Sequence, residues 1–190
     1  MFINKDNLTI RSARIEDAEI LTRWWNDGTV MAHAGFPNGL DQSIEVTISQ
    51  VEVNKIRLSQ ICIIEIDKIP VGEMSFGFQK DGIAEIGIKI CIPTYQNRGY
   101  GSKLTEMLIN YLFDDAELNQ KFMVKKIILD TNLKNQRAQH VYEKLGFTPM
   151  GVNYRAWKDQ QDQWQDTVDY EMTRESYKEL KKQSLYKVSF

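Results

Sequence analysis

Cysteine and proline are scarce in this chain, whose 190 residues include only 2 Cys and 4 Pro. Cys62 and Cys91 lie in separate apolar runs and show no metal-ligand spacing. We therefore expect two buried, reduced thiols rather than a disulfide, and no metal site. With so little proline, only 11 Gly and 42% hydrophobic residues, the composition excludes collagen-like repeats, disorder and low-complexity architecture.

A large excess of one charge and a long apolar run are also missing. The 24 basic and 26 acidic residues give a formal net charge of −2. This balance does not favour binding to nucleic acid, and the slight acidity favours a cationic substrate. No window approaches the roughly 20 apolar residues that span a bilayer, and the charged stretch 1–8 does not read as a signal peptide. We therefore expect a cytoplasmic protein without nucleic-acid or membrane partners, and a homodimer remains open.

Hydrophobic periodicity predicts one domain with a mixed α+β sheet, over residues 8–175, followed by a tail at 176–190. The predicted order is β-α-α-β-β-β-α-β-α-β-β. The expected strands are 8–14, 59–66, 71–78, 83–92, 126–131, 150–157 and 163–172, and the expected helices are 16–26, 43–55, one that starts at Ser102, and 135–145. In strand 83–92 the even-numbered residues are apolar, whereas the other face carries Glu85 and Lys89.

The loop Gln96-Asn97-Arg98-Gly99-Tyr100-Gly101 lies between a predicted strand and a predicted helix. Its glycines allow close approach of a ligand, and the free N–H groups and dipole of the helix favour an anion such as a pyrophosphate. A dinucleotide fingerprint would need a third glycine where Leu104 stands, and the Gly-Lys-Ser/Thr of a nucleotide-triphosphate loop is also missing. From spacing alone, a plain turn before a helix remains the alternative.

Two motifs together resemble the GNAT superfamily of N-acetyltransferases. The loop fits the pattern Gln/Arg-x-x-Gly-x-Gly/Ala, and Asn135-Gln136-Arg137-Ala138 with Tyr142-Glu143-Lys144-Leu145-Gly146-Phe147 is similar to the second motif of that superfamily. The resemblance covers roughly residues 8–173 and extends to spermidine and ribosomal-protein alanine acetyltransferases. It implies the GNAT fold, acetyl-CoA as co-substrate, no metal, and direct attack by a primary amine. The alternatives are an aminoglycoside acetyltransferase and a non-catalytic module that binds acetyl-CoA.

The resemblance also implies a coenzyme site. Main-chain groups at the end of strand 83–92 would pair with the pantetheine arm, the loop would hold the pyrophosphate, and an asparagine would hold the pantetheine near the thioester. The residues that match these positions are Ile90, Cys91, Ile92, Arg98, Gly99, Tyr100, Gly101, Ser102 and Asn135. Asn135 is equally suited to cap the following helix.

For catalysis, Tyr142 matches the tyrosine that protonates the departing thiolate in that superfamily. An amine that arrives as an ammonium must lose a proton before it attacks. Glu85 is the first candidate base, because Ala84-Glu85-Ile86-Gly87 is similar to a segment of the spermidine and ribosomal-protein enzymes; Glu73 is the second. A solvated carboxylate paired with Lys89, and deprotonation through water, remain alternatives. A backbone N–H near Ile90 or Ile92 would stabilise the oxyanion. The candidates for acceptor recognition are Trp24, Trp25, His33, Phe36 and Tyr154. The helical spacing of Trp24 and Trp25 favours a place in the core instead, and solvent exposure is the default for His33.

Overall fold

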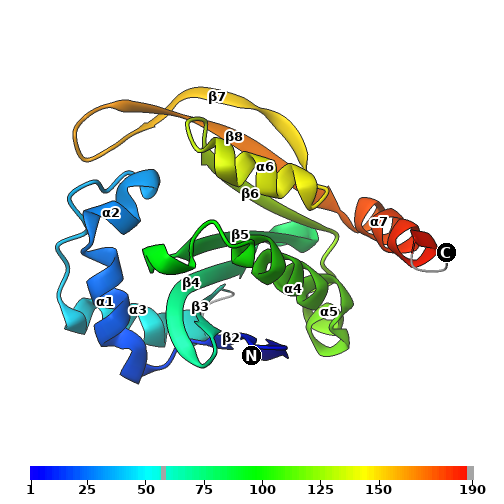
Figure 1. The fold of residues 1–190 in the computed structure, drawn as a ribbon, viewed down its shortest axis with the longest axis horizontal. Coiled ribbons are helices and arrows are strands. Elements are labelled where there is room, and N and C mark those ends of the chain that lie inside the picture. The colour runs from blue at the N-terminus through cyan, green and yellow to red at the C-terminus, as the bar shows by residue number, and fades with distance from the viewer. Residues whose placement is uncertain (57–58, 188–190) are drawn as a thin grey trace.

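The computed structural model describes residues 1–56 and 59–187. Within them, one eight-stranded sheet has the order β1-β2-β3-β4-β5-β6-β8-β7 (Figure 1). Neighbouring strands are antiparallel except for the parallel pair β5 and β6. The strands are β1 (Phe2–Lys5), β2 (Leu8–Ser12), β3 (Ser59–Ile66), β4 (Ile69–Phe78), β5 (Ile83–Ile90), β6 (Lys126–Asn132), β7 (Thr148–Lys158) and β8 (Trp164–Thr173).

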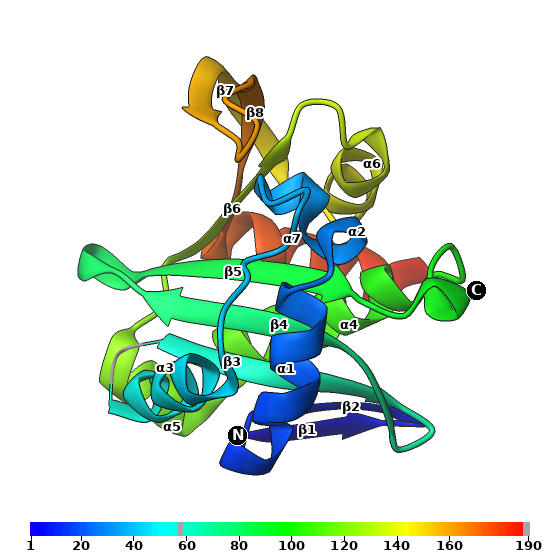
Figure 2. The same cartoon turned by 90° about the vertical axis from the view of Figure 1, so that its left-hand side faces the viewer.

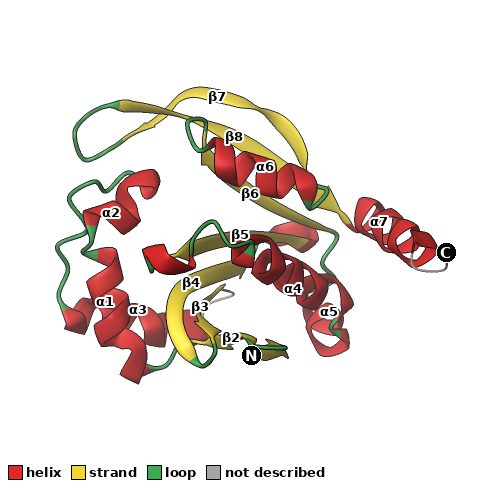
Figure 3. Ribbon diagram, in the orientation of Figure 1, coloured by secondary structure: helices red, strands yellow, loops and turns green. Residues whose placement is uncertain are grey.

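Helices cover both faces of the sheet (Figures 1 and 3). They are α1 (Ala18–Trp25), α2 (Gly28–Met31), α3 (Ile44–Ile56), α4 (Tyr100–Asp114), α5 (Ala116–Phe122), α6 (Gln136–Lys144) and α7 (Arg174–Lys187), with 3-10 turns η1 (Ile15–Asp17) and η2 (Ala32–Ala34). Figure 2 shows α1 and α3 in front of one face. The strands alternate, so that Ile64 belongs to the core under α4 and Ile63 to a second core under α1.

The predicted order of strands and longer helices is confirmed, and β1, α5 and α7 are additions to it. Strand β1 is only four residues long and mostly exposed, so it has no apolar alternation to reveal it. Helix α5 is a seven-residue extension after α4. Helix α7 occupies most of the segment predicted as a tail, and its Tyr177 ring stacks on Phe113 with 4.7 Å between centroids. Residues 188–190 of that predicted tail lie outside the described residues.

The parallel pair β5 and β6 separates soon after it begins. Their register has three residue pairs, the last being Glu85 with Ile128. Beyond this point β5 stays paired with β4 as far as Ile90, and β6 stays paired with β8 as far as Asn132. The sheet therefore opens between two strands that are each held from the other side, and the divergence is visible in Figure 1.

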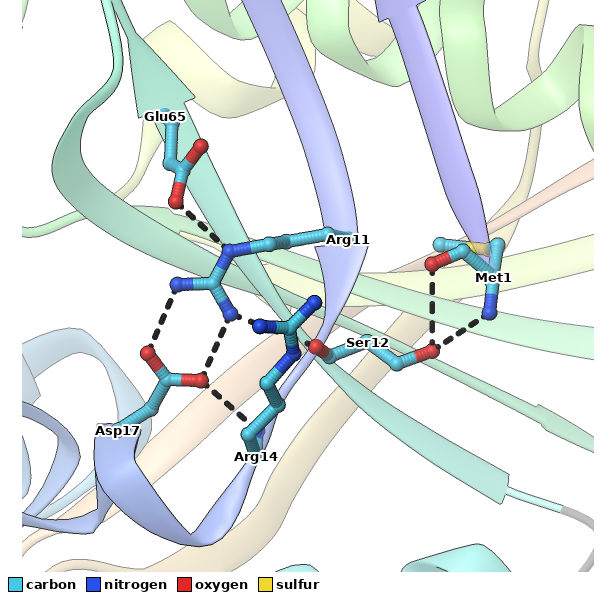
Figure 4. Close-up of polar contacts among 6 residues, drawn as sticks. All are labelled: Met1, Arg11, Ser12, Arg14, Asp17 and Glu65. Atoms are coloured by element: carbon cyan, nitrogen blue, oxygen red, sulfur yellow. Dashed lines mark hydrogen bonds and ion pairs between the residues drawn. The ribbon is translucent and has the colours of Figure 1, made fainter.

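A charged cluster holds the start of α1 on the sheet (Figure 4). Arg11 on β2 donates two hydrogen bonds to Asp17, of 2.7 and 2.8 Å, and a third of 2.7 Å to Glu65 on β3. The backbone N–H of Arg14 also donates to Asp17 at 2.7 Å. Burial alone would raise the pKa of Asp17, but the hydrogen bonds from Arg11 and Arg14 outweigh it and hold the pKa below its ordinary value.

Replacing Arg11 by alanine is expected to lower the free energy of unfolding by about 3 kcal/mol, because it leaves two largely buried carboxylates without their cation. The side chains of Arg11 and Asp17 are 15% and 11% exposed. Lys182→Ala is the matched control: its pair with Glu179 is exposed, so its loss should cost less than about 0.5 kcal/mol in urea denaturation.

The Arg11 contribution should also depend on pH in a defined direction. Since the folded pKa of Asp17 is depressed, its stabilisation is present above the ordinary value of 3.8 and is lost as the pH falls through the lower folded value. The stability difference between wild type and Arg11→Ala should therefore shrink in acid. A difference that stays constant from neutral pH down to acid unfolding would contradict this assignment.

Candidate active site

A cavity of about 710 Å³ lies where β5 and β6 separate. One end is lined by the first residues of α4, including Gly99, Gly101 and Ser102. The other end is lined by residues from α2 and η2, among them Thr29 and His33. Because α4 and α1–α2 cover opposite faces of the sheet, the cavity connects the two faces (Figures 1 and 3).

The glycine loop forms the wall of the cavity at the start of α4. Gly99 is the N-cap residue of the helix. Its φ of 78° is a left-handed conformation that favours glycine. Two side-chain bonds fix the loop: Gln96 donates to the carbonyl of Ile90 at 2.8 Å, and Arg137 donates to Asn97 at 3.1 Å. The helix therefore begins at a fixed position relative to both β5 and α6.

The loop fits a pyrophosphate. A Cβ added at Gly99 or at Gly101 would meet no heavy atom within 4 Å, so the space above both backbones is open to a ligand. The first N–H groups of the 15-residue helix α4 face that space with the positive end of its dipole. Tyr100 and Ser102 line the cavity as predicted, whereas Arg98 is exposed outside the lining, so its predicted phosphate contact is not supported.

A buried hydroxyl in the same wall was not predicted. Thr105 on α4 is fully buried and lines the cavity, and its Oγ1 has no hydrogen-bond partner among residues 1–56 and 59–187. A buried polar group without a partner is costly, unless a ligand supplies one. A threonine at a helical position gives no sequence signal for this role, because its lack of a partner is visible only in the packed structure.

At the end of β5, the N–H groups of two predicted ligand contacts are bonded within the sheet. The N–H groups of Cys91 and Ile92 both donate to the carbonyl of Val71 on β4, at 2.8 and 3.1 Å. Two residues thus oppose one, as in a β-bulge. Neither residue lines the cavity. Burial, reinforced by the charge of Glu73, raises the pKa of the Cys91 thiol to about 12, which leaves it protonated and inert.

The N–H of Ile90 points away from β4. Successive N–H groups of a strand point to opposite sides, so the N–H of Cys91 towards β4 places those of Ile90 and Ile88 towards the opening. The carbonyl of Ile90 points the same way, because it accepts the bond from Gln96. Both isoleucines line the cavity. Ile88 and Ile90 therefore present main-chain N–H groups to the opening, where Ile90 and Ile92 were predicted to do so.

Tyr142 on α6 lines the cavity and is 8% exposed. Its ring lies edge-on to Phe147 and Tyr170, with centroids 6.0 and 5.7 Å away. Burial, followed by the charge of Asp130, raises the pKa of Tyr142 to about 12, so the hydroxyl is protonated at neutral pH. Full proton transfer to a thiolate of ordinary pKa about 8.5 is unfavourable, so this hydroxyl is suited to donate a hydrogen bond to the sulfur.

Asn135 lines the cavity one residue before α6. Its Oδ1 accepts a hydrogen bond of 3.2 Å from the N–H of Ala138, which confirms the predicted cap. The amide nitrogen is left to face the cavity. The capping bond and a ligand contact are therefore compatible, since they use different atoms of the same amide.

Of the two predicted base candidates, Glu73 lines the cavity and is 7% exposed. Both of its oxygens are engaged: Trp25 Nε1 donates to Oε2 at 2.9 Å, and Lys89 Nζ donates to Oε1 at 2.5 Å. The predicted pairing of a strand carboxylate with Lys89 thus involves Glu73. Trp25, a candidate for acceptor recognition whose helical spacing favoured the core, is buried as that spacing indicated, and its indole N–H holds this carboxylate.

Glu85, the first base candidate, lies outside the cavity lining. It is exposed and accepts a hydrogen bond of 2.9 Å from Gln79. The reason is its register. Glu85 pairs with Ile128 before the two strands separate, so its side chain projects into solvent from the paired part of the sheet. Asp130, two residues beyond that pair on β6, does line the cavity. Sequence reasoning missed Asp130, although an acidic residue directly after the apolar run 127–129 was a usable signal.

The end of the cavity near α2 and η2 is closed by the β7–β8 hairpin. The Trp157 ring lies so close to Gly35 that a Cβ there would meet it at 2.4 Å, and the N–H of Gln160 donates to the Gly35 carbonyl at 2.9 Å. Trp157 and the predicted His33 line the cavity. The other predicted acceptor residues do not: Trp24 is in the core under α1, and Phe36 and Tyr154 are exposed.

The described part of the chain contains neither a metal-binding cluster nor a membrane-spanning helix. No group of three or more His, Cys, Asp or Glu side chains there could hold a metal ion. No helix in the same residues combines the length and apolar character needed to cross a membrane. Cys62 and Cys91 are both free and buried, which confirms the prediction of two thiols.

Known proteins similar to this chain were identified from both sequence and structure. The sequence profile of the acetyltransferase (GNAT) domain matches residues 7–148. An uncharacterized N-acetyltransferase, p20, from Bacillus licheniformis is 28% identical over 123 residues, covering 60% of this chain and 67% of that protein.

Two solved structures share the fold. A ribosomal L7/L12 alpha-N-protein acetyltransferase in complex with coenzyme A has a TM-score of 0.79 at 18% identity, over 91% of this chain and 98% of the other. The spermidine N-acetyltransferase of Vibrio cholerae, in complex with CoA and spermine, has a TM-score of 0.76 at 20% identity, over 91% and 99%. The mixed sheet, the glycine loop before α4 and the matching profile agree: the chain belongs to the GNAT family and is an acetyl-CoA-dependent N-acetyltransferase.

Proposed function

We propose that the protein transfers the acetyl group of acetyl-CoA to a primary amine carried by a small polyamine or a protein N-terminus. The observation that carries the proposal is the cavity that joins the two faces of the sheet at the β5–β6 opening. One ligand can then enter from the α4 face and a second from the α2 face. Direct attack requires this arrangement, because both reactants must be present together.

At the α4 end, the chain offers groups for each part of a coenzyme. The loop at Gly99 to Ser102 would hold the pyrophosphate, and Thr105, Asn135 and the main chain of Ile90 would hold the pantetheine arm. When bound, acetyl-CoA supplies an activated acyl carbon with a thiolate as leaving group. The N–H group of Ile88 or of Ile90 would donate to the acyl oxygen, and Tyr142 would donate to the sulfur.

At the α2 end, the lining favours a cationic or polar acceptor. Glu73 and Asp130 bring carboxylates to this half of the cavity, and His33 and Trp157 complete its wall. The related folds that bind spermine or act on a ribosomal-protein N-terminus make a polyamine and an N-terminal amine the first two acceptors to test. We place the reaction in the cytoplasm, where buried thiols such as Cys62 and Cys91 stay reduced.

The direct test is release of free thiol from acetyl-CoA in the presence of spermidine, an N-terminal alanine peptide or an aminoglycoside. Release with spermidine or the peptide is the expected result, and release with the aminoglycoside alone would change the acceptor class. Measurable binding of acetyl-CoA without thiol release from any of the three would overturn the proposal in favour of a non-catalytic binding module.

Replacing Thr105 by valine is expected to raise the stability of the free protein and to lower its affinity for acetyl-CoA. Valine keeps the shape and removes the hydroxyl that has no partner among the described residues. The free protein should be stabilised by about 1 kcal/mol, because a buried unsatisfied group is removed. The affinity for acetyl-CoA should fall about 10-fold, since the ligand loses a hydrogen bond. Calorimetry and urea denaturation measure the two effects, and equal affinities would exclude Thr105 from the coenzyme site.

A further inference from the structure

We propose that Asp130 is the residue that accepts the proton of the acceptor amine, a role that rests on the proposed function above. The two carboxylates that the sequence favoured are poorly placed for it. Glu85 projects into solvent from the paired part of the sheet, outside the cavity lining. Both oxygens of Glu73 are engaged, one by Trp25 and one by Lys89. Asp130 is the other carboxylate that lines the cavity in the described part of the chain.

The position of Asp130 follows from the strand register. It lies on β6 two residues past the last pair with β5, where the sheet has opened. Leu129, its neighbour, is buried in the same core as Tyr142, so alternation places Asp130 on the opposite face. The proposed proton acceptor and the Tyr142 hydroxyl therefore approach the opening from opposite sides of the sheet, as the amine and the sulfur must.

The surroundings of Asp130 suit a base. Among the described residues its carboxylate has no hydrogen-bond partner in another side chain, so its lone pairs are available to a substrate. Desolvation, followed by the charges of Asp169 and Glu85, raises the pKa of Asp130. A base with a raised pKa holds an abstracted proton better at neutral pH. Because the residue as a whole is exposed, it can return that proton to water after each turnover.

Titratable groups from several elements surround Asp130. Asp169 on β8 is its cross-strand partner and accepts a hydrogen bond of 2.8 Å from Asn153. Those that border it or line the same cavity are Glu85 and Lys89 on β5, Glu73 on β4, Tyr95 before the glycine loop, Tyr100 on α4, Arg137 and Tyr142 on α6, and His33 on η2. Lys89 is already paired with Glu73. His33 is therefore the rival proton acceptor.

The proton balance of the step is simple. One N–H bond of the ammonium breaks, and its proton moves to a carboxylate oxygen of Asp130. The freed electron pair attacks the acyl carbon and forms the C–N bond, and the C–S bond then breaks with its electron pair on the sulfur. The nitrogen loses its second proton to water as the amide forms, and the sulfur, hydrogen-bonded by Tyr142, takes one proton from water. Asp130 then releases its proton to solvent, so one proton is produced for each acetyl group transferred.

The test is the pH dependence of kcat/KM for thiol release with the best amine of the panel. In wild type, activity should fall in acid as Asp130 becomes protonated. Asp130→Asn should lower kcat/KM at neutral pH about 100-fold and abolish this acid limb, with unchanged acetyl-CoA affinity. Asp169→Asn should retain the limb and move it to lower pH, because removing a neighbouring negative charge lowers the pKa of Asp130.

Three outcomes would overturn the assignment. If Asp130→Asn keeps the wild-type rate and pH profile, Asp130 is not the proton acceptor, while the proposed acetyl transfer still stands. An acid limb that survives in Asp130→Asn and disappears in His33→Asn would give the role to His33. Wild type that binds acetyl-CoA but acetylates none of the amines would overturn the proposed function itself, and the role of Asp130 with it.

Discussion

Replacing Gly99 by valine is expected to weaken acetyl-CoA binding by at least about 100-fold, equivalent to about 2.7 kcal/mol. Two causes act together. Gly99 has φ 78°, a conformation that is strained for a β-branched residue and that sets the start of α4. The new side chain would also enter the open space above the loop, where no protein atom lies within 4 Å of the Cβ position. Calorimetric titration with acetyl-CoA measures the effect.

Two further glycine variants separate these causes. Gly101→Ala adds a methyl group to the same open space at a residue whose φ is not positive, so any loss of affinity reports steric exclusion alone. Gly151→Val places the same valine on β7, where a Cβ also meets nothing within 4 Å, and should leave affinity unchanged. Wild-type affinity in Gly99→Val would refute the assignment of this loop to the coenzyme.

Local features of the site could be predicted from the sequence. The glycine loop is recognisable because the need for glycine at Gly99 arises within a few residues of chain. Asn135 and Tyr142 belong to one predicted helix. Their spacing already places Asn135 at the start of α6, as its cap, and Tyr142 on the buried face of that helix. The alternation in strand 83–92 correctly placed the apolar residues 84, 86, 88 and 90 on the face of the core under α4, since side-chain direction in a strand is also a local property.

What the sequence did not predict depends on pairing between distant segments. Whether Glu85 or Asp130 reaches the cavity is decided by where β5 and β6 separate, and this is a matter of register between strands about 40 residues apart. The loss of Cys91 and Ile92 as ligand contacts has the same origin, because a bulge against Val71 turns both N–H groups towards β4. Motif spacing contains no information about either event.

Replacing Tyr142 by phenylalanine is expected to reduce kcat about 100-fold while acetyl-CoA affinity changes less than about 2-fold. The hydroxyl has no hydrogen-bond partner among the described residues, so its removal leaves no buried group unsatisfied. The ring keeps its edge-on contacts with Phe147 and Tyr170. Single-turnover thiol release and calorimetry separate the two quantities, because the first reports the chemical step and the second reports binding.

The choice of thioester as acetyl donor can sharpen this test of Tyr142. A hydrogen bond to the sulfur matters most when the leaving thiolate is basic, so an acetyl thioester of a more acidic thiol should lose less rate in Tyr142→Phe than acetyl-CoA does. Tyr170→Phe is the matched control, since its hydroxyl instead donates to Glu143 at 2.9 Å. It should retain the wild-type rate on both thioesters. An equal loss in Tyr142→Phe on both thioesters would mean that Tyr142 shapes the cavity rather than assisting departure of the sulfur.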